Sequence, residues 1–224
     1  MDAILQNFFN LAVYRDVFGF LLRGLWTTVW LSLLVIPIGA ASGLVIAVAA
    51  TQTRRRWVRF LLAAYVDFFR AFPPLVLLIF IYYGVPFLGI DLPKLMAVAI
   101  GFMLNNSSYY AEVFRAGIES VPGGQAEAAR STGLTRMQAL RHVVIPQATR
   151  NVLPDLVGNS IEVVKLTTIA SVVAIPELLR VARDAQSLVY NPSPIVLAAL
   201  MYLALLWPLV RWLSRLEHRH VQAR

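Results

Sequence analysis

QAEAARSTGLTRMQALRHVVIP, residues 125–146, is the stretch that decides the fold of this chain, because it is polar and helix-forming between long apolar segments. Gly133 predicts the left-handed turn that ends a first short helix over residues 125–132. Thr135 is placed to cap a second helix that runs to residue 144 and is closed by Pro146. Glu127 is expected near the first turn of the first helix, where the helix dipole favours a carboxylate.

The composition around this stretch is that of a membrane protein. Hydrophobic residues make up 58% of the 224 residues and charged residues 14%, against about 25% charged residues in an average soluble domain. Three long runs, residues 24–53, 71–90 and 185–210, contain no charged residue. A helix needs roughly 20 mainly apolar residues to cross the hydrocarbon core of a bilayer. The absence of cysteine excludes disulfides and thiolate metal sites.

The predicted fold is an all-α, polytopic membrane protein with five transmembrane helices and a cytoplasmic helix–turn–helix coupling loop over residues 119–147. The predicted spans cover residues 20–50, 61–83, 95–114, 152–175 and 195–212. The fourth span is the weakest, because Asp155, Glu162 and Lys165 interrupt its apolar pattern. No internal repeat or low-complexity linker divides the chain, so residues 1–224 are expected to form a single transmembrane domain.

Basic residues predict the orientation of these spans. Residues 51–60, residues 115–150 and the segment after residue 210 contain thirteen arginines, whereas the loops on the other side contain five arginines and lysines. Loops rich in arginine and lysine stay in the cytoplasm. The N-terminus is therefore expected outside and the C-terminus inside, which requires an odd number of spans. The segment after Pro176 is expected to form a short amphipathic helix on the outer surface.

The 125–146 stretch resembles the EAA loop of ABC-transporter permeases, in which Glu-Ala-Ala is followed by a glycine and then by an apolar-x-apolar-Pro ending. Glu127, Gly133 and Pro146 stand at the matching positions. The sequences YVDFFRAFPPLVLL from residue 65 and YYAEVFRAGI from residue 109 also resemble the second and third spans of permeases for polar amino acids. Residues 148–182 resemble their fourth span. The resemblance covers roughly residues 20–215 and is specific to the histidine, glutamine, arginine and opine uptake branch.

This resemblance implies a MetI-like fold and the role of a non-catalytic permease subunit in an ATP-driven importer for polar amino acids or related compounds. The implied location is the bacterial inner (plasma) membrane. The implied partners are a second permease subunit (the same or a sister chain), a cytoplasmic ABC ATPase dimer that binds ATP and Mg, and an extracytoplasmic substrate-binding protein. The implied ATPase-coupling residues are Glu127, Ala128, Ala129, Arg130, Gly133 and Pro146.

Charged and amide side chains at membrane depth are the candidate substrate path. Arg, Lys or Asp at the bilayer centre costs roughly 2.5–3.5 kcal/mol, so such residues are expected to face the helix bundle or a wet cavity. Asp67 and Arg70 are three residues apart, and Pro73 is expected to break the second span beside them. Two alternatives stay open: local charge pairs that keep helices in register, and amides that hydrogen-bond between helices. The candidates are Arg70, Asn105, Asn106, Glu162 and Lys165.

Several functions are disfavoured by the sequence. No GxxxxGK[ST] motif is present, so this chain is not expected to hydrolyse ATP by that route. The three histidines, His142, His218 and His220, are expected to be solvated, with no metal site and no cofactor in the chain. Nucleic acid is not an expected partner, although a DNA-binding helix-turn-helix has a similar pattern, because membrane spans flank the loop. The rival function is an ion-coupled secondary transporter that uses buried Glu162 and Lys165.

The charge bias generates a prediction about topology. A cysteine introduced at Ala3 should react with a membrane-impermeant maleimide in intact cells, whereas one introduced at Gln222 should react only after the cells are opened. The reverse labelling pattern would refute the five-span topology.

Overall fold

The part of the chain that its computed structural model describes consists of helices and short connections and contains no strand. The description covers the backbone of residues 2–222 and excludes the side chains of residues 2, 3, 5 and 218–222. The all-α prediction is confirmed. His218 and His220, and the Ala3 and Gln222 side chains of the topology prediction, lie outside the described side chains.

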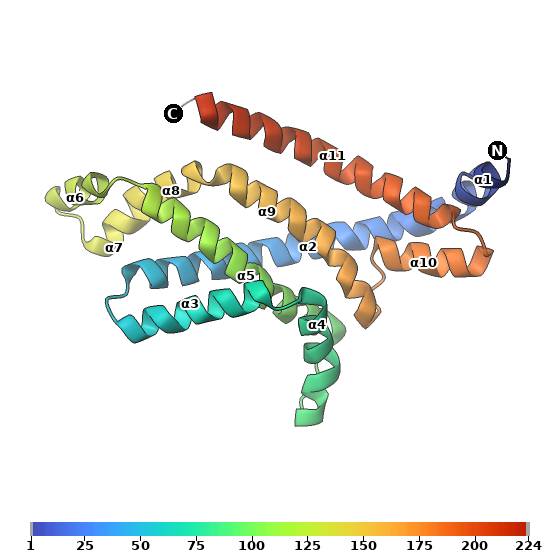
Figure 1. Ribbon diagram of the computed structural model, residues 1–224, viewed down its shortest axis with the longest axis horizontal. Helices are drawn as coiled ribbons and strands as arrows, with labels where there is room; N and C mark the ends of the chain where they lie inside the picture. Colours follow the sequence, from blue (N-terminus) through green and yellow to red (C-terminus); the bar gives the residue numbers. More distant parts are fainter. Residues whose placement is uncertain (1, 223–224) are drawn as a thin grey trace. The chain divides into compact units, whose positions relative to one another are not determined.

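The helices follow one another with short connections (Figure 1). In chain order they are α1 (Asp2–Phe8), α2 (Leu11–Gln52), α3 (Arg56–Ala71), α4 (Pro74–Ile79), η1 (Phe80–Gly84), η2 (Val85–Leu88), α5 (Lys94–Ser120), α6 (Gly123–Ser131), α7 (Arg136–Ala139), η3 (Leu140–Val144), α8 (Ile145–Asn151), α9 (Leu153–Leu166), η4 (Thr167–Val173), α10 (Leu178–Val189) and α11 (Ser193–Gln222).

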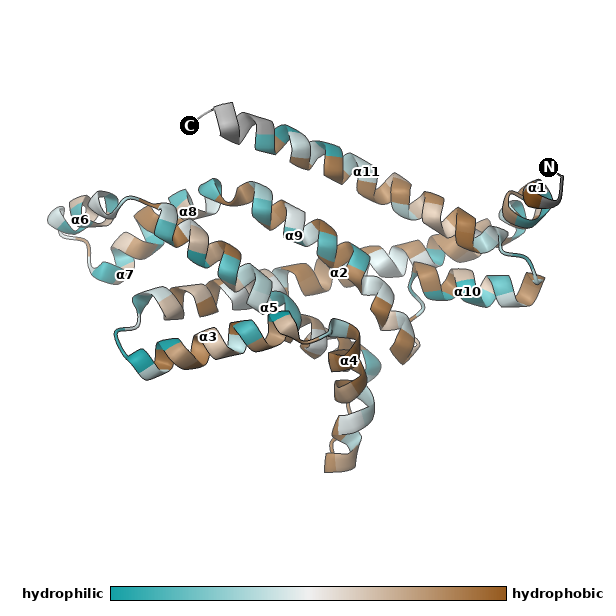
Figure 2. Ribbon diagram, in the orientation of Figure 1, coloured by the Kyte–Doolittle hydropathy of each residue, from teal (hydrophilic) through white to brown (hydrophobic). Residues whose placement is uncertain are grey.

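Three helical segments are long and apolar enough to cross a membrane: Gln6–Gln52, Leu153–Val173 and Ser193–Glu217. A fourth candidate counts only if the bent pair of α3 and α4–η2 forms one span. Figure 2 shows the contrast between the almost uniformly hydrophobic α4 and the hydrophilic residues of α6 and α7. Among the described residues α5 is not such a candidate, so five spans stay a prediction.

The second predicted span is broken, as its prolines indicate. Helix α3 ends at Ala71, Phe72 is extended with φ −81° and ψ 129°, and Pro74 begins α4. A residue before proline is pushed out of the helical region, and proline fits the first turn of a new helix.

The described helices divide into two compact units, each assembled from distant parts of the chain. Unit 1 contains Met1–Ile36, Pro74–Gly101 and Ile161–Trp212, and unit 2 contains Pro37–Pro73, Phe102–Ser160 and Leu213–Arg224. Helices α2, α5, α9 and α11 each begin in one unit and end in the other.

The core of unit 1 joins α2, α10 and α11. Its buried residues are Val17, Leu21, Leu178, Val181, Ala182, Ala185, Ala198 and Met201. A Cβ atom at Gly24 would lie 3.0 Å from the Leu178 Cα, so α2 and α10 are in close contact. Helix α10 has the amphipathic pattern predicted after Pro176, with Arg180 paired to Asp184 at 3.2 Å on its outer side.

Glu177 is fully buried at the start of α10 and acts as its N-cap. Its carboxylate accepts the Leu179 and Arg180 backbone N–H groups at 2.8 and 2.7 Å, and the Tyr202 hydroxyl at 2.9 Å. Burial raises the pKa of Glu177, and these hydrogen bonds, together with the charge of Arg183, oppose that rise. The start of α10 and its contact with α11 therefore both depend on the buried Glu177 carboxyl group.

Unit 2 is organised by the close approach of α2 to α5. A Cβ atom at Gly43 would lie 2.5 Å from the Tyr110 Cβ and 2.8 Å from the Ala111 backbone nitrogen. A Cβ atom at Gly39 would lie 2.9 Å from the Asn106 Cβ. Glycines four residues apart let two helix backbones approach closely, as in GxxxG helix pairs.

Polar side chains tie the other helices of unit 2 to α5. The hydroxyls of Tyr65 and Ser107 lie 2.7 Å apart and link α3 to α5. The Tyr110 and Ser160 hydroxyls lie 2.8 Å apart and link α5 to α9, while Asn151 Nδ2 donates to Ser120 Oγ at 2.9 Å. Such bonds satisfy polar groups that would be costly inside an apolar environment.

Pro146 does not close the helix that precedes it, contrary to the sequence prediction. Leu140–Val144 forms a π-helical turn in which the Ile145 N–H bonds the Leu140 carbonyl five residues back, and α8 continues from there. Pro146 falls in the first turn of α8, where a missing N–H is tolerated. Phe80–Gly84 forms the same turn just before Pro86 in unit 1. The wider π turn lets each helix pass its proline.

The Gly43 contact generates a prediction. Gly43→Ala should lower the unfolding temperature of the purified protein, because overpacking against backbone atoms costs about 1–3 kcal/mol, more than the helix propensity gained. Gly19→Ala in the same helix is the matched control, since no neighbouring atom lies within 4 Å of its added Cβ. Equal unfolding temperatures for the two variants would contradict this packing.

The buried carboxyl generates a second prediction. Because the pKa of Glu177 is raised in the folded state, its contribution to stability is full below its unfolded pKa and is lost as pH rises through the folded pKa. Glu177→Gln should therefore gain stability relative to the wild type as pH rises from 4 to 8, measured by thermal unfolding. Glu177→Ala, which removes the cap at every pH, should be less stable throughout by about 1 kcal/mol. If the difference in unfolding temperature between Glu177→Gln and the wild type stayed constant from pH 4 to 8, the raised pKa of Glu177 would be contradicted.

Candidate functional site

Two local features predicted for the loop between α5 and α8 are present, the Gly133 turn and the Thr135 cap. Gly133 is left-handed with φ +94°, and it ends α6 in a Schellman motif: the Leu134 N–H bonds the Ala129 carbonyl and the Gly133 N–H bonds the Arg130 carbonyl. Thr135 caps α7, and its side chain and that of Gln138 form a reciprocal capping box. The turn between the two helices is therefore fixed from both sides.

The first helix of the loop starts earlier than predicted, which places Glu127 just past its first turn. Helix α6 begins at Gly123, two residues earlier than predicted, so Glu127 is in the second turn. Pro122, whose backbone is extended with ψ 134°, precedes the helix, and Gly123 and Gly124 are the first two residues of α6. The carboxylate is exposed and is not placed to stabilise the helix start.

A hollow of about 400 Å³ lies beside this loop within unit 2. Its apolar lining comes from Ile118, Val121, Ala139, Leu140 and Val144. Its charged lining consists of one acidic and three basic side chains, Glu127, Arg54, Arg130 and Arg136. Arg136 donates to the Gln52 side-chain and backbone oxygens at 2.9 and 3.2 Å, which ties α7 to the end of α2.

The predicted coupling residues occupy different positions around this hollow. Glu127 and Arg130 line it, and both side chains are exposed. Ala129 is buried beneath the loop, whereas Ala128 is exposed on α6. Gly133 forms the turn, and Pro146 is exposed at the start of α8. Of the two alanines, Ala129 therefore packs inside the unit and Ala128 lies on its surface.

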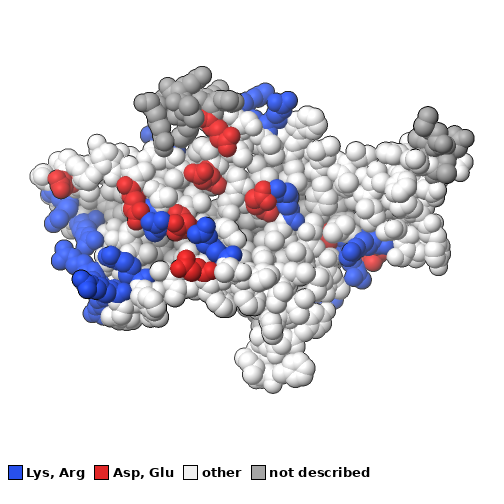
Figure 3. All heavy atoms as spheres, in the orientation of Figure 1, with Lys and Arg blue, Asp and Glu red and all other residues white. Residues whose placement is uncertain are grey.

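Arginines gather at the same end of unit 2. Figure 3 shows a dense group of basic side chains over the α2–α3 connection and the α6–α7 loop. The exposed members are Arg54, Arg55, Arg56, Arg59, Arg130, Arg136 and Arg141. Such an end favours anionic groups of a partner or of lipid.

Three predicted path residues belong to unit 2. Asn105 is buried and its Nδ2 donates to the Phe69 carbonyl at 3.1 Å, next to the break at the end of α3. Asn106 is 2% exposed, and its Nδ2 has no partner among the described residues. The Arg70 guanidinium lies 5.6 Å from the ring centre of Tyr109. Among the described residues Arg70 therefore pairs with this aromatic ring and not with Asp67, three residues earlier.

The other two path residues, Glu162 and Lys165, belong to unit 1. They form an ion pair with each other, as one turn of helix allows. Their side chains are 67% and 49% exposed, so the prediction that they are buried is wrong for the chain by itself. Ile161, Val163 and Val164 occupy the buried face of the same helix, which turns the charged pair outward.

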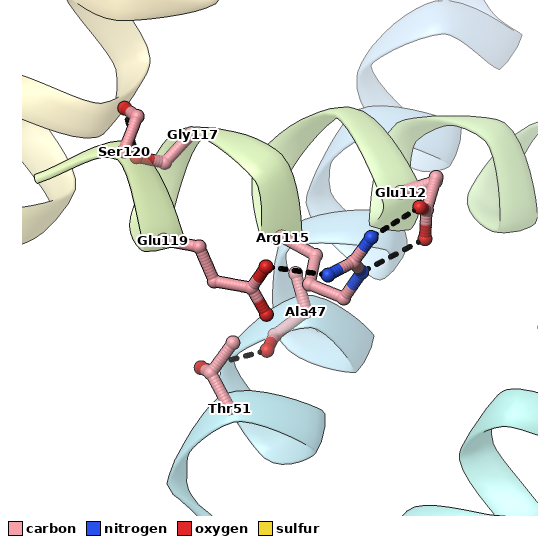
Figure 4. Close-up of polar contacts among 7 residues, drawn as sticks. All are labelled: Ala47, Thr51, Glu112, Arg115, Gly117, Glu119 and Ser120. Carbon is pink, nitrogen blue, oxygen red and sulfur yellow. Dashed lines mark hydrogen bonds and ion pairs between the residues drawn. The ribbon is translucent and has the colours of Figure 1, made fainter.

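A charged cavity that the sequence analysis missed lies between α2, α3 and α5 of unit 2. Its volume is about 540 Å³, and its charged lining is Arg59, Asp67, Glu112, Arg115 and Glu119. In Figure 4 Arg115 lies between the two glutamates of its own helix. It pairs in a bidentate manner with Glu112, and its Nη1 lies 2.6 Å from Glu119. The spacing Glu-x-x-Arg-x-x-x-Glu was the signal that could have revealed this ladder.

Among the described residues, no group of three His, Asp or Glu side chains is arranged to hold a metal ion. The described linings of both hollows combine charged and apolar side chains.

The comparisons with known proteins agree in pointing to one family. A family model described as "Binding-protein-dependent transport system inner membrane component" matches residues 39–221. The probable amino-acid ABC transporter permease protein YckA of Bacillus subtilis is 33% identical, with 89% of this chain and 88% of that protein covered. The probable glutamine ABC transporter permease protein GlnM of the same organism is also 33% identical, with 94% and 97% covered.

Solved structures show the same fold. The crystal structure of an amino acid ABC transporter with histidines contains a chain that is 35% identical, with a TM-score of 0.80 and coverage of 91% of this chain and 95% of that one. A chain of the inward-facing MetNI methionine ABC transporter is 21% identical, with a TM-score of 0.77 and coverage of 92% and 98%. At 21% identity, the similarity to the methionine transporter chain shows the fold alone.

Proposed function

This chain belongs to the family of binding-protein-dependent transport system inner membrane components and is a permease subunit of an ABC importer for amino acids, and we propose that it forms the translocation path together with a second permease subunit. The second subunit is another copy or a sister chain. A cytoplasmic ABC ATPase dimer supplies energy, and an extracytoplasmic binding protein delivers the substrate. ATP and Mg are bound by the ATPase, so this chain has no catalytic role.

The loop from α6 to α8 is the surface that receives the ATPase in this proposal. The observation that carries it is the hollow beside α6 and α7, which combines an apolar lining with Glu127, Arg130 and Arg136 at its edge. A partner helix can place an apolar side chain into such a hollow and its charges on the rim. The fixed Gly133 turn and capped α7 make the surface rigid enough to transmit displacement.

The proposed orientation follows from the arginine-rich end of unit 2. That end faces the cytoplasm, the N-terminus is outside, and the protein lies in the bacterial inner membrane as a multi-pass subunit. Both units together form one transmembrane domain, residues 1–224, which is supported by a family match that runs through parts of both units.

The proposed substrate path includes Arg70, Asn105, Asn106, Glu162 and Lys165. The exposure of Arg70, Glu162 and Lys165 in the single chain suits side chains that face a second subunit or a wet path. The unpartnered Asn106 amide is a hydrogen-bonding group that such a path or a bound water can satisfy. The ion-coupled transporter receives no support from any relative, and its charged pair is exposed.

The proposal is tested by reconstituting the permease with its ATPase and a loaded binding protein in proteoliposomes. Amino-acid uptake should require ATP and the binding protein, and an uncoupler should leave it intact. Uptake that persists without the ATPase and collapses with the uncoupler would overturn the proposed function.

Two variants of the loop test the coupling surface in the same system. Gly133→Val should abolish most ATP-driven uptake, because a β-branched residue is strained at φ +94°. Glu127→Lys should reduce binding-protein-stimulated ATP hydrolysis, because it reverses the one acidic charge among the described residues that line the hollow. Both variants should still insert in the membrane, which co-purification of the second permease subunit measures.

The matched control is Gly124→Val, since Gly124 is not left-handed and has no atom within 4 Å of an added Cβ. It should retain uptake. If Gly133→Val and Glu127→Lys kept the ATPase subunit, stimulated hydrolysis and uptake at wild-type levels, the loop would not be the coupling element.

A further inference from the structure

The connection between α2 and α3 in unit 2 places three consecutive arginines beside an apolar helix surface. Arg54 and Arg55 belong to the connection, and Arg56 is the first residue of α3. All three are exposed, within the basic group that Figure 3 shows at this end of the unit. None of them forms an ion pair with another described residue. Their guanidinium groups are therefore available to an anion from outside the chain.

The backbone that carries these arginines is held in place. The Thr53 hydroxyl accepts the Arg55 backbone N–H at 3.3 Å, and Arg59 donates to the Thr53 carbonyl at 3.1 Å. One residue earlier, the Gln52 side chain accepts a hydrogen bond from Arg136 of α7 at 2.9 Å. A ligand that binds to a connection fixed in this way pays little for ordering the chain.

The arginines of this region lie in different surroundings. Arg54 lines the hollow beside α6 and α7, and Arg59 lines the charged cavity between α2, α3 and α5. Arg55 and Arg56 line neither of these two hollows. The ATPase contact proposed above therefore uses Arg54 and leaves Arg55 and Arg56 for another anionic partner.

An exposed apolar stripe continues along α3 from these two arginines. Trp57, Phe60, Leu61 and Phe68 form it, and each of these side chains is more than half exposed. Their spacings of three, four and eleven residues place them on one face of the helix. Arg56 stands four residues before Phe60, so its side chain lies one turn from the stripe.

The stripe has the length of one leaflet of a bilayer. Trp57 and Phe68 are eleven positions apart, which corresponds to about 16 Å along the helix axis. Half of a hydrocarbon core of about 30 Å is about 15 Å. Tryptophan prefers the level of the lipid headgroups, and Trp57 stands at the arginine end of the stripe. Cation, tryptophan and apolar stripe thus follow one another in the order of the phosphate, glycerol and acyl chains of a phospholipid.

We propose that the Arg55 and Arg56 side chains bind the phosphate of an anionic phospholipid of the cytoplasmic leaflet, whose acyl chains lie along the α3 stripe. Two unpaired guanidinium groups attract a headgroup with a net negative charge and repel the ammonium group of a zwitterionic one. A free phosphate ion lacks the acyl chains that the stripe contacts. The proposal uses the orientation given above and does not depend on the substrate that the importer carries.

Lipid binding is measured by native mass spectrometry of the complete purified importer. The complex is titrated with phosphatidylglycerol or with phosphatidylcholine of the same acyl chains, and the wild type should bind phosphatidylglycerol more tightly. Arg55→Gln and Arg56→Gln should each weaken phosphatidylglycerol binding about fivefold, and together about 25-fold, since an arginine near an anionic headgroup contributes about 1 kcal/mol. Phosphatidylcholine binding should not change. Inorganic phosphate at the concentration of the lipid should not compete.

The matched control is Arg211→Gln. Arg211 is an exposed arginine that directly precedes the exposed Trp212 on α11, so it repeats the arginine–tryptophan pair away from the α2–α3 connection. This variant should bind phosphatidylglycerol as the wild type does. The double variant should still co-purify with the ATPase subunit, because neither arginine lines the hollow that receives the ATPase.

The proposal is overturned if the wild type binds the two lipids equally, or if the double variant keeps wild-type affinity for phosphatidylglycerol, as it would if the second permease subunit covered α3. Equal weakening by Arg211→Gln would show a general effect of surface charge and would also overturn it. Competition by inorganic phosphate would point to a site for free anions. Loss of the ATPase subunit from a double variant that still binds the lipid would assign the arginines to a protein contact. Binding is measured without transport, so a failure of ATP-driven uptake would count against the importer function alone.

Discussion

The close approach of α2 to α5 is the contact on which unit 2 depends. Gly43 brings the backbone of α2 against the Ala111 nitrogen and the Ser107 carbonyl, where a methyl group has no room. Lipid provides no hydrophobic drive between apolar helices, so such pairs are held by close packing and by hydrogen bonds between helices. Helix α5 then positions the rest of the unit, because α3, α8 and α9 are each tied to it by polar side chains.

The same helix connects the two hollows of unit 2. Its last turns supply Glu112, Arg115 and Glu119 to the charged cavity and Ile118 to the hollow beside the loop. The two hollows differ in chemistry. One has an apolar lining with charges at the rim, which suits a protein surface. The other is lined by five charged side chains, Arg59, Asp67, Glu112, Arg115 and Glu119.

Helix ends and breaks in this protein are fixed by local chemistry rather than by apolar burial. Gly133 and Thr135 define the loop turn, Glu177 caps α10 from inside the core of unit 1, and Phe72 and Pro73 end α3. The two π-helical turns precede Pro86 and Pro146 and let helices continue past them. Backbone groups freed at such sites must be satisfied within the protein where lipid replaces water.

The sequence by itself determined the class of the protein, the apolar segments, the break at Pro73 and the Gly133 turn with its Thr135 cap, because these depend on composition and on neighbours within a few residues. Its motifs also indicated the family that the comparisons confirm. Only the tertiary structure decided that Glu127 lies in the second helical turn, that Pro146 continues a helix and that Glu162 and Lys165 face outward. It alone assembled Arg59 and Asp67 of α3 with Glu112 of α5 in one cavity. Side-chain burial and cavities depend on which helices pack together, and residues more than 40 positions apart along the chain carry no local signal of that contact.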